Sequence, residues 1–157
     1  MTDRVASPRL AIPALGGIYQ ALSGWSYPLV RATAGLFLMP HGAQKLFGWF
    51  GGYGIAGTGE FFATQLGMTP GWLWALAAGL IEFFGGLALV LGFLTRPVAA
   101  AVVVFMAVAM FWVHIGNGFF VTNGGYEYAL MWGLIALAIL FRGGGEHSLD
   151  RRLGWEF

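Results

Sequence analysis

The stretch GWLWALAAGLIEFFGGLALVLGFL, from Gly71 to Leu94, decides the fold of this chain. It holds 24 residues, and Glu82 near its centre is the only charged one. As a helix it would be about 36 Å long, enough to cross a hydrocarbon core of about 30 Å. A carboxylate at that depth costs at least about 2.5–3.5 kcal/mol. The stretch therefore predicts a transmembrane helix with a functional acid in its middle.

Composition predicts an integral membrane protein. The chain has 157 residues, of which 58% are hydrophobic and 10% are charged, whereas soluble domains carry about 25% charged residues. The mean hydropathy is +0.72. The net charge of +1, with no cluster of Lys or Arg, predicts no nucleic-acid partner. Cysteine is absent, so disulfides, thiol redox chemistry and Cys-ligated metal centres are excluded within this chain. Any redox role then needs a bound cofactor, another residue type or a partner subunit.

The predicted fold is all-α, an integral membrane four-helix bundle. The expected transmembrane helices are residues 27–49, 71–93, 97–117 and 125–141. The first 26 residues form an N-terminal cytoplasmic or interfacial segment, the bundle domain covers 27–143, and 144–157 form a cytoplasmic tail. Ser7-Pro8 could start a short surface helix in the first segment, although a disordered tail fits equally well. We expect no cleavable signal peptide, because prolines and glycines interrupt any long apolar core.

The distribution of Lys and Arg predicts the orientation. One side carries every arginine and the other carries only Lys45, so the positive-inside rule places both termini in the cytoplasm. The longest outer connection, residues 50–70, begins with glycines. Thr58 or Gly59 could cap a short interfacial helix there, with an apolar face of Phe61, Phe62 and Leu66. This segment is either a lid over the outer face or a plain glycine-rich loop.

On the first helix, Arg31, His41 and Lys45 project within about 80° of one another. Lipid is a poor neighbour for such a face. Pro40 frees the carbonyl of Leu36 and should kink the helix, which indicates either a cavity beside His41 or a packing kink.

On the second helix, Glu82 shares a stripe with Gly79 and Gly86. Small residues let helices approach closely, so Glu82 should face another helix. Its candidate partners are Arg31, His41, Lys45 and His114. A structural ion pair and a ligand- or proton-handling site both remain open.

Two further ionisable residues fall in the outer half of the predicted bundle. His114 lies near the outer end of the third helix, and Glu127 begins the fourth, where a carboxylate also suits the helix dipole. We predict a ligand or proton site there. Its candidate residues are Arg31, His41, Lys45, Glu82, His114 and Glu127. Two histidines with carboxylates could instead bind a metal, or a haem through His41 and His114. Their different predicted heights and irregular spacing speak against haem and against any metal.

The sequence resembles the DoxX family of small bacterial membrane proteins. The residues that carry the resemblance are Arg31, HGAQKL at 41–46, EFFGGLAL at 82–89, LGFLTR at 91–96 and GGEHSLD at 144–150. The resemblance covers about residues 25–153 and implies a multi-pass four-helix protein of the bacterial inner membrane. The family name comes from a subunit of a thiosulfate–quinone oxidoreductase, and relatives are linked to quinone or catechol resistance and to oxidative-stress complexes. The cysteines of thiol-linked relatives are missing here.

These observations together favour a membrane subunit for quinone-linked redox chemistry, whose status as an enzyme stays open. The quinone would be a small apolar ligand, and electrons would come from a redox partner subunit or a bound cofactor. The alternative is a non-enzymatic transporter, binding protein or assembly partner. Apart from the lipid bilayer, the small-residue stripes permit a homodimer without requiring one.

Overall fold

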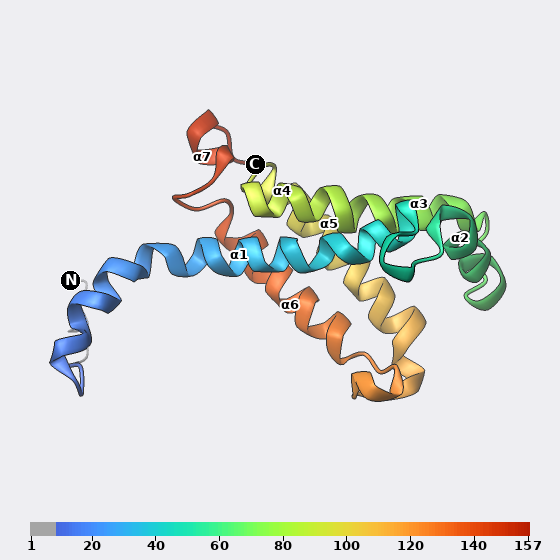
Figure 1. The fold of residues 1–157 in the computed structure, drawn as a ribbon, viewed down its shortest axis with the longest axis horizontal. Helices are drawn as coiled ribbons and strands as arrows, with labels where there is room; N and C mark the ends of the chain where they lie inside the picture. The colour runs from blue at the N-terminus through green and yellow to red at the C-terminus, as the bar shows by residue number, and fades with distance from the viewer. Residues whose placement is uncertain (1–8) are drawn as a thin grey trace, which may run out of the picture.

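The computed structural model describes residues 9–157 as a chain of helices (Figure 1). Within that range there is no strand, so the predicted all-α class is confirmed. Its α-helices of more than five residues are α1 (Gly16–Phe47), α2 (Gly54–Gln65), α3 (Gly71–Leu80), α4 (Gly86–Leu91), α5 (Thr95–Val108) and α6 (Glu127–Arg142). A short α7 (Leu149–Leu153) follows near the C-terminus.

Helix α1 begins well before the predicted start at Tyr27. It runs without a break from Gly16 through Pro28 and Pro40 to Phe47. The predicted surface helix of the N-terminal segment is therefore the first part of α1 rather than a separate element or a disordered tail from Gly16 onward. Its proposed start at Ser7-Pro8 lies outside the described residues.

Two helical segments are long and apolar enough to cross a membrane, residues 71–91 and 95–117. In the first, a π-helical turn, Ile81–Gly85, joins α3 to α4. In the second, α5 continues into the π-helical segment Ala109–His114. The starts and ends differ from the predicted ones by at most two residues, and α6 likewise begins at Glu127 instead of Gly125.

Helix α2 is longer than the one or two turns predicted for the outer connection. It starts at Gly54, after glycines with left-handed backbone angles such as Gly48 at φ 71°. It packs on α3, where a Cβ on Gly59 would lie 2.9 Å from the Trp72 Cα. The indole Nε1 of Trp112 donates to the carbonyl of Leu66 at 3.0 Å, which ties the end of α2 to the α5 segment.

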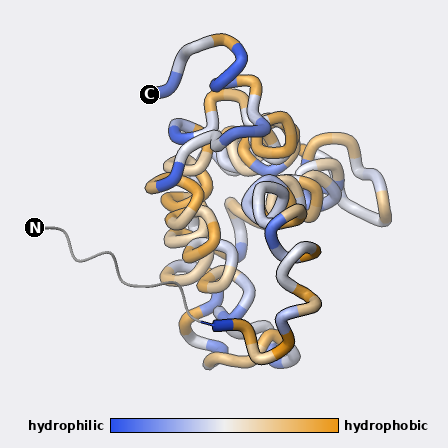
Figure 2. The backbone as a smooth tube through the Cα atoms, turned by 90° about the vertical axis from the view of Figure 1, so that its left-hand side faces the viewer, coloured by the Kyte–Doolittle hydropathy of each residue, from blue (hydrophilic) through white to orange (hydrophobic). Residues whose placement is uncertain are grey.

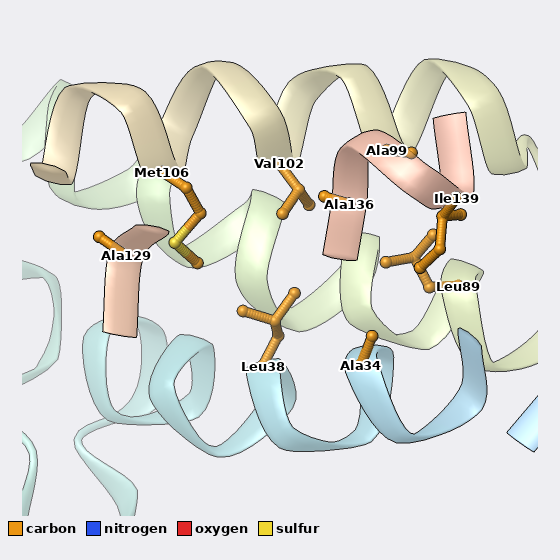
Figure 3. Close-up of a cluster of buried hydrophobic side chains, with 9 residues drawn as sticks. All are labelled: Ala34, Leu38, Leu89, Ala99, Val102, Met106, Ala129, Ala136 and Ile139. Atoms are coloured by element: carbon orange, nitrogen blue, oxygen red, sulfur yellow. The ribbon is translucent and has the colours of Figure 1, made fainter. Parts of the chain in front are cut away.

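The long helices pack as two pairs. Helix α1 lies along α3 and α4, while α5 lies along α6, and the pairs meet where α4, the Ile81–Gly85 turn and α1 contact α5 or α6 (Figure 1). Among the described residues α3 makes no comparable contact with α5 or α6, so the pairs separate toward the other end. The core lies where they meet (Figure 3). Its buried side chains are Ala34, Leu38, Leu89, Ala99, Val102, Met106, Ala129, Ala136 and Ile139.

Glycines form the contact between α1 and α4. A Cβ on Gly35 would lie 2.9 Å from the backbone nitrogen of Val90, and one on Gly86 would lie 3.0 Å from the Cγ of Met39. The predicted small-residue stripe on the second helix therefore does face another helix. This close approach fixes how α1 presents its polar side chains to the helix that carries Glu82.

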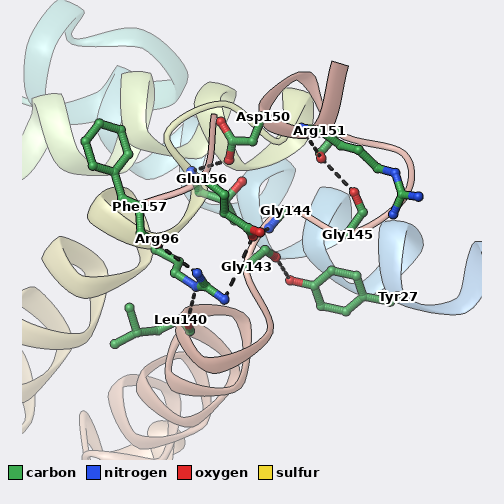
Figure 4. Close-up of polar contacts among 12 residues, drawn as sticks. Tyr27, Arg96, Leu140, Gly143, Gly144, Gly145, Asp150, Arg151, Glu156 and Phe157 are labelled. Carbon is green, nitrogen blue, oxygen red and sulfur yellow. Dashed lines mark hydrogen bonds and ion pairs between the residues drawn. The ribbon is translucent and has the colours of Figure 1, made fainter. Parts of the chain in front are cut away.

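The segment after α6 folds back over the end where α4 and α5 join (Figure 4). Asp150, which is buried, accepts hydrogen bonds from the backbone nitrogens of Leu94 at 2.7 Å and Thr95 at 2.9 Å. These bonds cap α5 from a distant part of the chain and explain its start before Pro97. Figure 2 shows the contrast between the mostly hydrophobic helices and this largely hydrophilic segment. The segment expected as a tail is thus folded against the helices.

Candidate functional site

Glu82 forms an ion pair with Lys45 in the interior of the molecule. The Lys45 Nζ lies 2.7 Å from the Glu82 Oε2, and Glu82 is only 5% exposed. At this distance the ammonium is within hydrogen-bond reach of Oε2, which has no further partner among the described residues. Lys45 also donates weakly to the carbonyl of His41, at 3.5 Å. Of the four partners proposed for Glu82 from the sequence, Lys45 is the one the structure selects.

Local backbone geometry brings the two side chains together. Glu82 lies in the π-helical turn Ile81–Gly85, and such turns shift the register of a helix and occur frequently at functional sites. On α1, Gly42 packs against Phe83, whose Cα would lie 2.8 Å from a Cβ at Gly42. Any larger residue would push α1 away from the turn. The glycine therefore allows Lys45, one turn further along, to reach the carboxylate.

The ion pair borders a mainly apolar cavity of about 800 Å³ between the two helix pairs. Helix α2 and all four long helical segments contribute to its walls. Besides Lys45 and Glu82, its polar or aromatic lining residues are His41, Phe61, Phe62, Trp74, Phe105, His114, Tyr128 and Trp132. A charged pair at the edge of an aromatic cavity is the usual arrangement of a site that binds a small, mostly apolar ligand through a few polar contacts.

Two more of the residues singled out from the sequence line this cavity. His41 follows Pro40 on α1 and is exposed to the cavity, so a cavity does lie beside this proline. His114 ends the second π-helical segment, and its Nδ1 lies 2.7 Å from the carbonyl of Gly124. That contact fixes the ring and leaves Nε2 as its other polar atom. Each of the two π-helical segments therefore carries one candidate residue of the same site.

Arg31 and Glu127 lie outside the cavity. Arg31 shares an angular face of α1 with Lys45, but 14 residues separate them, or about 21 Å along the axis. Its side chain is buried and donates to the carbonyl oxygens of Leu89, at 2.9 Å, His147, at 2.7 Å, and Gly144. Arg31 shares only the helical face with the site residues, and it lies on the side opposite to Lys45, as the distribution of Lys and Arg predicted.

Glu127 at the start of α6 has a local role. Its Oε2 accepts a hydrogen bond from the backbone nitrogen of Val121 at 3.0 Å, which closes the loop before the helix. The structure therefore gives this carboxylate the stabilising role at a helix N-terminus that was one of its two interpretations.

Aromatic walls are the part of the cavity that sequence reasoning missed. Trp74, Tyr128 and Trp132 line the cavity but were given no role in this site from the sequence. The apolar face predicted for the outer helix, Phe61, Phe62 and Leu66, does line the cavity from α2. In the part of the chain that the structure describes, no group of three or more His, Asp or Glu side chains could hold a metal ion.

Helices of this length and apolarity, with polar side chains held at a cavity between them, define a helical membrane protein. The family model of DoxX matches residues 27–115, more than half of the sequence, and the chain belongs to the DoxX family. The match includes His41, Lys45, Glu82 and His114, and ends before Glu127.

A protein of Haemophilus influenzae, described as uncharacterized, is similar to this chain. The two are 38% identical over 106 residues, which cover 62% of this chain and 79% of the relative. No solved structure matches the chain.

Proposed function

We propose that this chain is a membrane subunit for quinone-linked redox chemistry and that it binds a quinone headgroup in the cavity beside Glu82. The observation that carries this proposal is the Lys45–Glu82 ion pair at the edge of an aromatic cavity of about 800 Å³. The DoxX family and the membrane character of the chain agree with it without naming the ligand.

The lining suits a flat ring with polar oxygens. Indole and phenol rings from Trp74, Trp132 and Tyr128 offer stacking surfaces. The Lys45 ammonium can donate a hydrogen bond to a ligand carbonyl, and His41 or His114 can donate another. Lys45 is the one polar partner of Glu82 Oε2 among the described residues, so a ligand hydroxyl, as on a quinol, would add a second hydrogen bond to the carboxylate.

Proton transfer is the chemistry that these residues can supply. Reduction of a quinone to a quinol takes up two electrons and two protons. Glu82 and the histidines can carry protons to the ligand oxygens, since an acid or imidazole within a membrane commonly serves as a relay. The chain has no cysteine, so we assign the electrons to a redox partner subunit or a bound cofactor.

We further propose a bundle of four transmembrane segments: α1, residues 71–91, residues 95–117 and α6. Arg96 and Arg142 lie at the end of the molecule where the C-terminal segment folds back. Lys45 lies in the last turn of α1, beside the cavity. The positive-inside rule then places that end and both termini in the cytoplasm of a bacterium, with the chain in its inner membrane. The cavity accordingly occupies the outer half of the bundle.

The test is direct binding of a short-chain ubiquinone or menaquinone to the purified protein in detergent. Binding is measured by the quenching of tryptophan fluorescence. We expect Glu82→Gln and His41→Ala to weaken binding at least about tenfold, the loss typical of one buried polar contact. Glu60→Gln and His147→Ala make the same chemical changes outside the cavity and should bind as the unchanged protein does. Equal affinity in all four variants would refute the site.

A second measurement separates redox chemistry from transport. The protein is placed in proteoliposomes that contain a redox-active quinone. Membranes that supply the partner subunit are then added, and the formation of quinol is measured. The proposal expects quinol formation that depends on this chain and on Glu82. Movement of quinone across the membrane with no electron donor present would instead favour the transporter interpretation.

A further inference from the structure

A second cavity lies at the opposite end of the molecule, beside the returning C-terminal segment. It has a volume of about 710 Å³ and is bordered by the first half of α1, the end of α6 and residues 145–156. Tyr27 and Arg142 face each other on its wall, with the guanidinium carbon 4.6 Å from the ring centroid. None of the residues proposed for the quinone site borders it.

Two arginines on this wall have no carboxylate partner. Among the described residues, neither Arg142 nor Arg151 lies within 4.0 Å of a carboxylate oxygen. The tyrosine ring holds the Arg142 guanidinium from one side, and Arg142 borders the cavity. Guanidinium groups of this kind are the preferred protein partners of phosphate, which they bind with two parallel hydrogen bonds.

The carboxylates of the same wall are mostly engaged elsewhere. Asp150 accepts two backbone hydrogen bonds from the start of α5, and Glu156 accepts one from the nitrogen of Gly144 at 2.9 Å while facing Arg96 at 4.0 Å (Figure 4). Glu146 is exposed and has no such partner within residues 9–157. Of the carboxylates on this wall, Glu146 and Asp150 have no cation partner among the described residues, but Asp150 is held by the backbone N–H groups at the start of α5, so Glu146 is the acid that most directly opposes the two arginines.

Exposed aromatic side chains lie on or next to the lining residues of the cavity. Trp155 borders the cavity and is 73% exposed. Trp25 follows the lining residue Gly24, stacks on the ring of His147 at 4.1 Å and is still 58% exposed, and Phe141, which precedes Arg142, is 73% exposed. Tryptophan is typical of the level where lipid headgroups meet acyl chains. Arginines beside such a surface attract anionic lipids, and basic pockets at helix ends bind their phosphate groups.

We propose that this cavity binds the phosphate of an anionic phospholipid, with Arg142 and Arg151 as its ligands and the exposed aromatic side chains against the acyl chains. A bound headgroup would join α1, α6 and the C-terminal segment. The proposal rests on the four transmembrane segments proposed above, which place this end of the molecule at the membrane surface, and it stands whether or not the other cavity binds a quinone.

The experiment is native mass spectrometry of the full chain released from detergent with phosphatidylglycerol or phosphatidylcholine. We expect retained phosphatidylglycerol adducts at low lipid ratios and few phosphatidylcholine adducts. The double variant Arg142→Gln/Arg151→Gln should lower phosphatidylglycerol affinity by roughly thirtyfold, because each cation near an anionic lipid contributes a factor of about five. Glu146→Gln should strengthen binding, since it removes the unpaired acid.

Arg152 provides the matched control. It neighbours Arg151 on α7 and is exposed, but it does not border the cavity. Arg152→Gln should therefore keep the adducts although it makes the same change in charge as Arg151→Gln. Equal losses in these two single variants would overturn the site in favour of diffuse surface charge. Full displacement of the lipid by millimolar inorganic phosphate would overturn the lipid assignment and indicate a soluble phosphate compound as the ligand.

Discussion

Arg31 and Lys45 are both cations of α1, yet the structure treats them differently. Arg31 is 2% exposed and donates to three backbone carbonyls from α4 and the C-terminal segment. Lys45 keeps 22% of its side chain exposed, pairs with one carboxylate and faces a cavity. The first environment surrounds a buried cation with backbone carbonyls. The second leaves part of the pair open to a ligand.

Under the proposed function, this difference separates a structural cation from one that contacts the ligand. The planar guanidinium reaches carbonyls that come from segments far apart in sequence, so it fastens the C-terminal segment to the helices. The Lys45–Glu82 pair joins only neighbouring helices that already pack through glycines. We therefore expect stability to depend strongly on Arg31 and weakly on the ion pair, and ligand binding to show the reverse order.

The largest loss of stability should follow Arg31→Met. The substitution keeps most of the volume but leaves the carbonyls of Gly144 and His147 without the Arg31 donor, whereas the carbonyl of Leu89 keeps the backbone nitrogen of Gly92 at 3.2 Å. At about 1–3 kcal/mol for each buried group, the total loss should reach about 3–5 kcal/mol. Thermal unfolding in detergent measures it, with the exposed Arg152→Met as control. Similar unfolding midpoints for both variants would show that Arg31 does not have the structural role described above.

A smaller loss should follow Gly35→Ala, which probes the contact between α1 and α4. The added Cβ would meet the backbone of Val90 at 2.9 Å, so the helices must separate at a cost of about 1–3 kcal/mol. Gly24→Ala on the same helix meets nothing within 4 Å and should stabilise the helix by about 0.5–1 kcal/mol. Opposite shifts of the unfolding midpoint are expected. Equal shifts would mean that the glycine contact is looser than the structure shows.

Asp150→Ala should cost somewhat less, about 1–2 kcal/mol, because it removes the cap of α5. Leu94 would lose support as well, since it holds a left-handed backbone with φ 48° that a non-glycine residue rarely adopts. Hydrogen exchange of the first turn of α5 measures the local effect. Glu146→Ala, on the same segment but exposed, should leave that exchange unchanged. Equal protection in both variants would show that Asp150 does not cap α5.

Sequence reasoning predicted the parts of this fold that depend on local pattern. The apolar stretch with Glu82, the small-residue face and Lys45 as one candidate partner all follow from the helical period. Arg31 was grouped with the wrong cluster because a helical face gives an angle, whereas contact also depends on position along the axis.

Long-range features of the structure were beyond that reasoning. The capping of α5 by Asp150 requires the chain to return after more than fifty residues, as the hydrogen bond from Thr95 shows. The π-helical turns at Glu82 and His114 have no signature in hydrophobic period. The cavity arises because α3 does not follow α5, which is a property of packing between helix pairs. Its aromatic walls could therefore be assembled only from the structure.

The smallest loss of stability should come from the double variant Lys45→Met/Glu82→Gln. Replacing both members of a buried ion pair with neutral side chains of similar size is often neutral or stabilising, because the charges no longer have to leave water. We expect a change below about 1 kcal/mol. Lys45→Met alone should cost more, because it leaves the buried carboxylate without a counter-ion. Unfolding in detergent compares the three proteins, and quinone binding to the double variant should be lost although its fold is kept. A double variant as unstable as Arg31→Met would show that the ion pair holds the helices together, and Lys45 would then be a structural cation like Arg31.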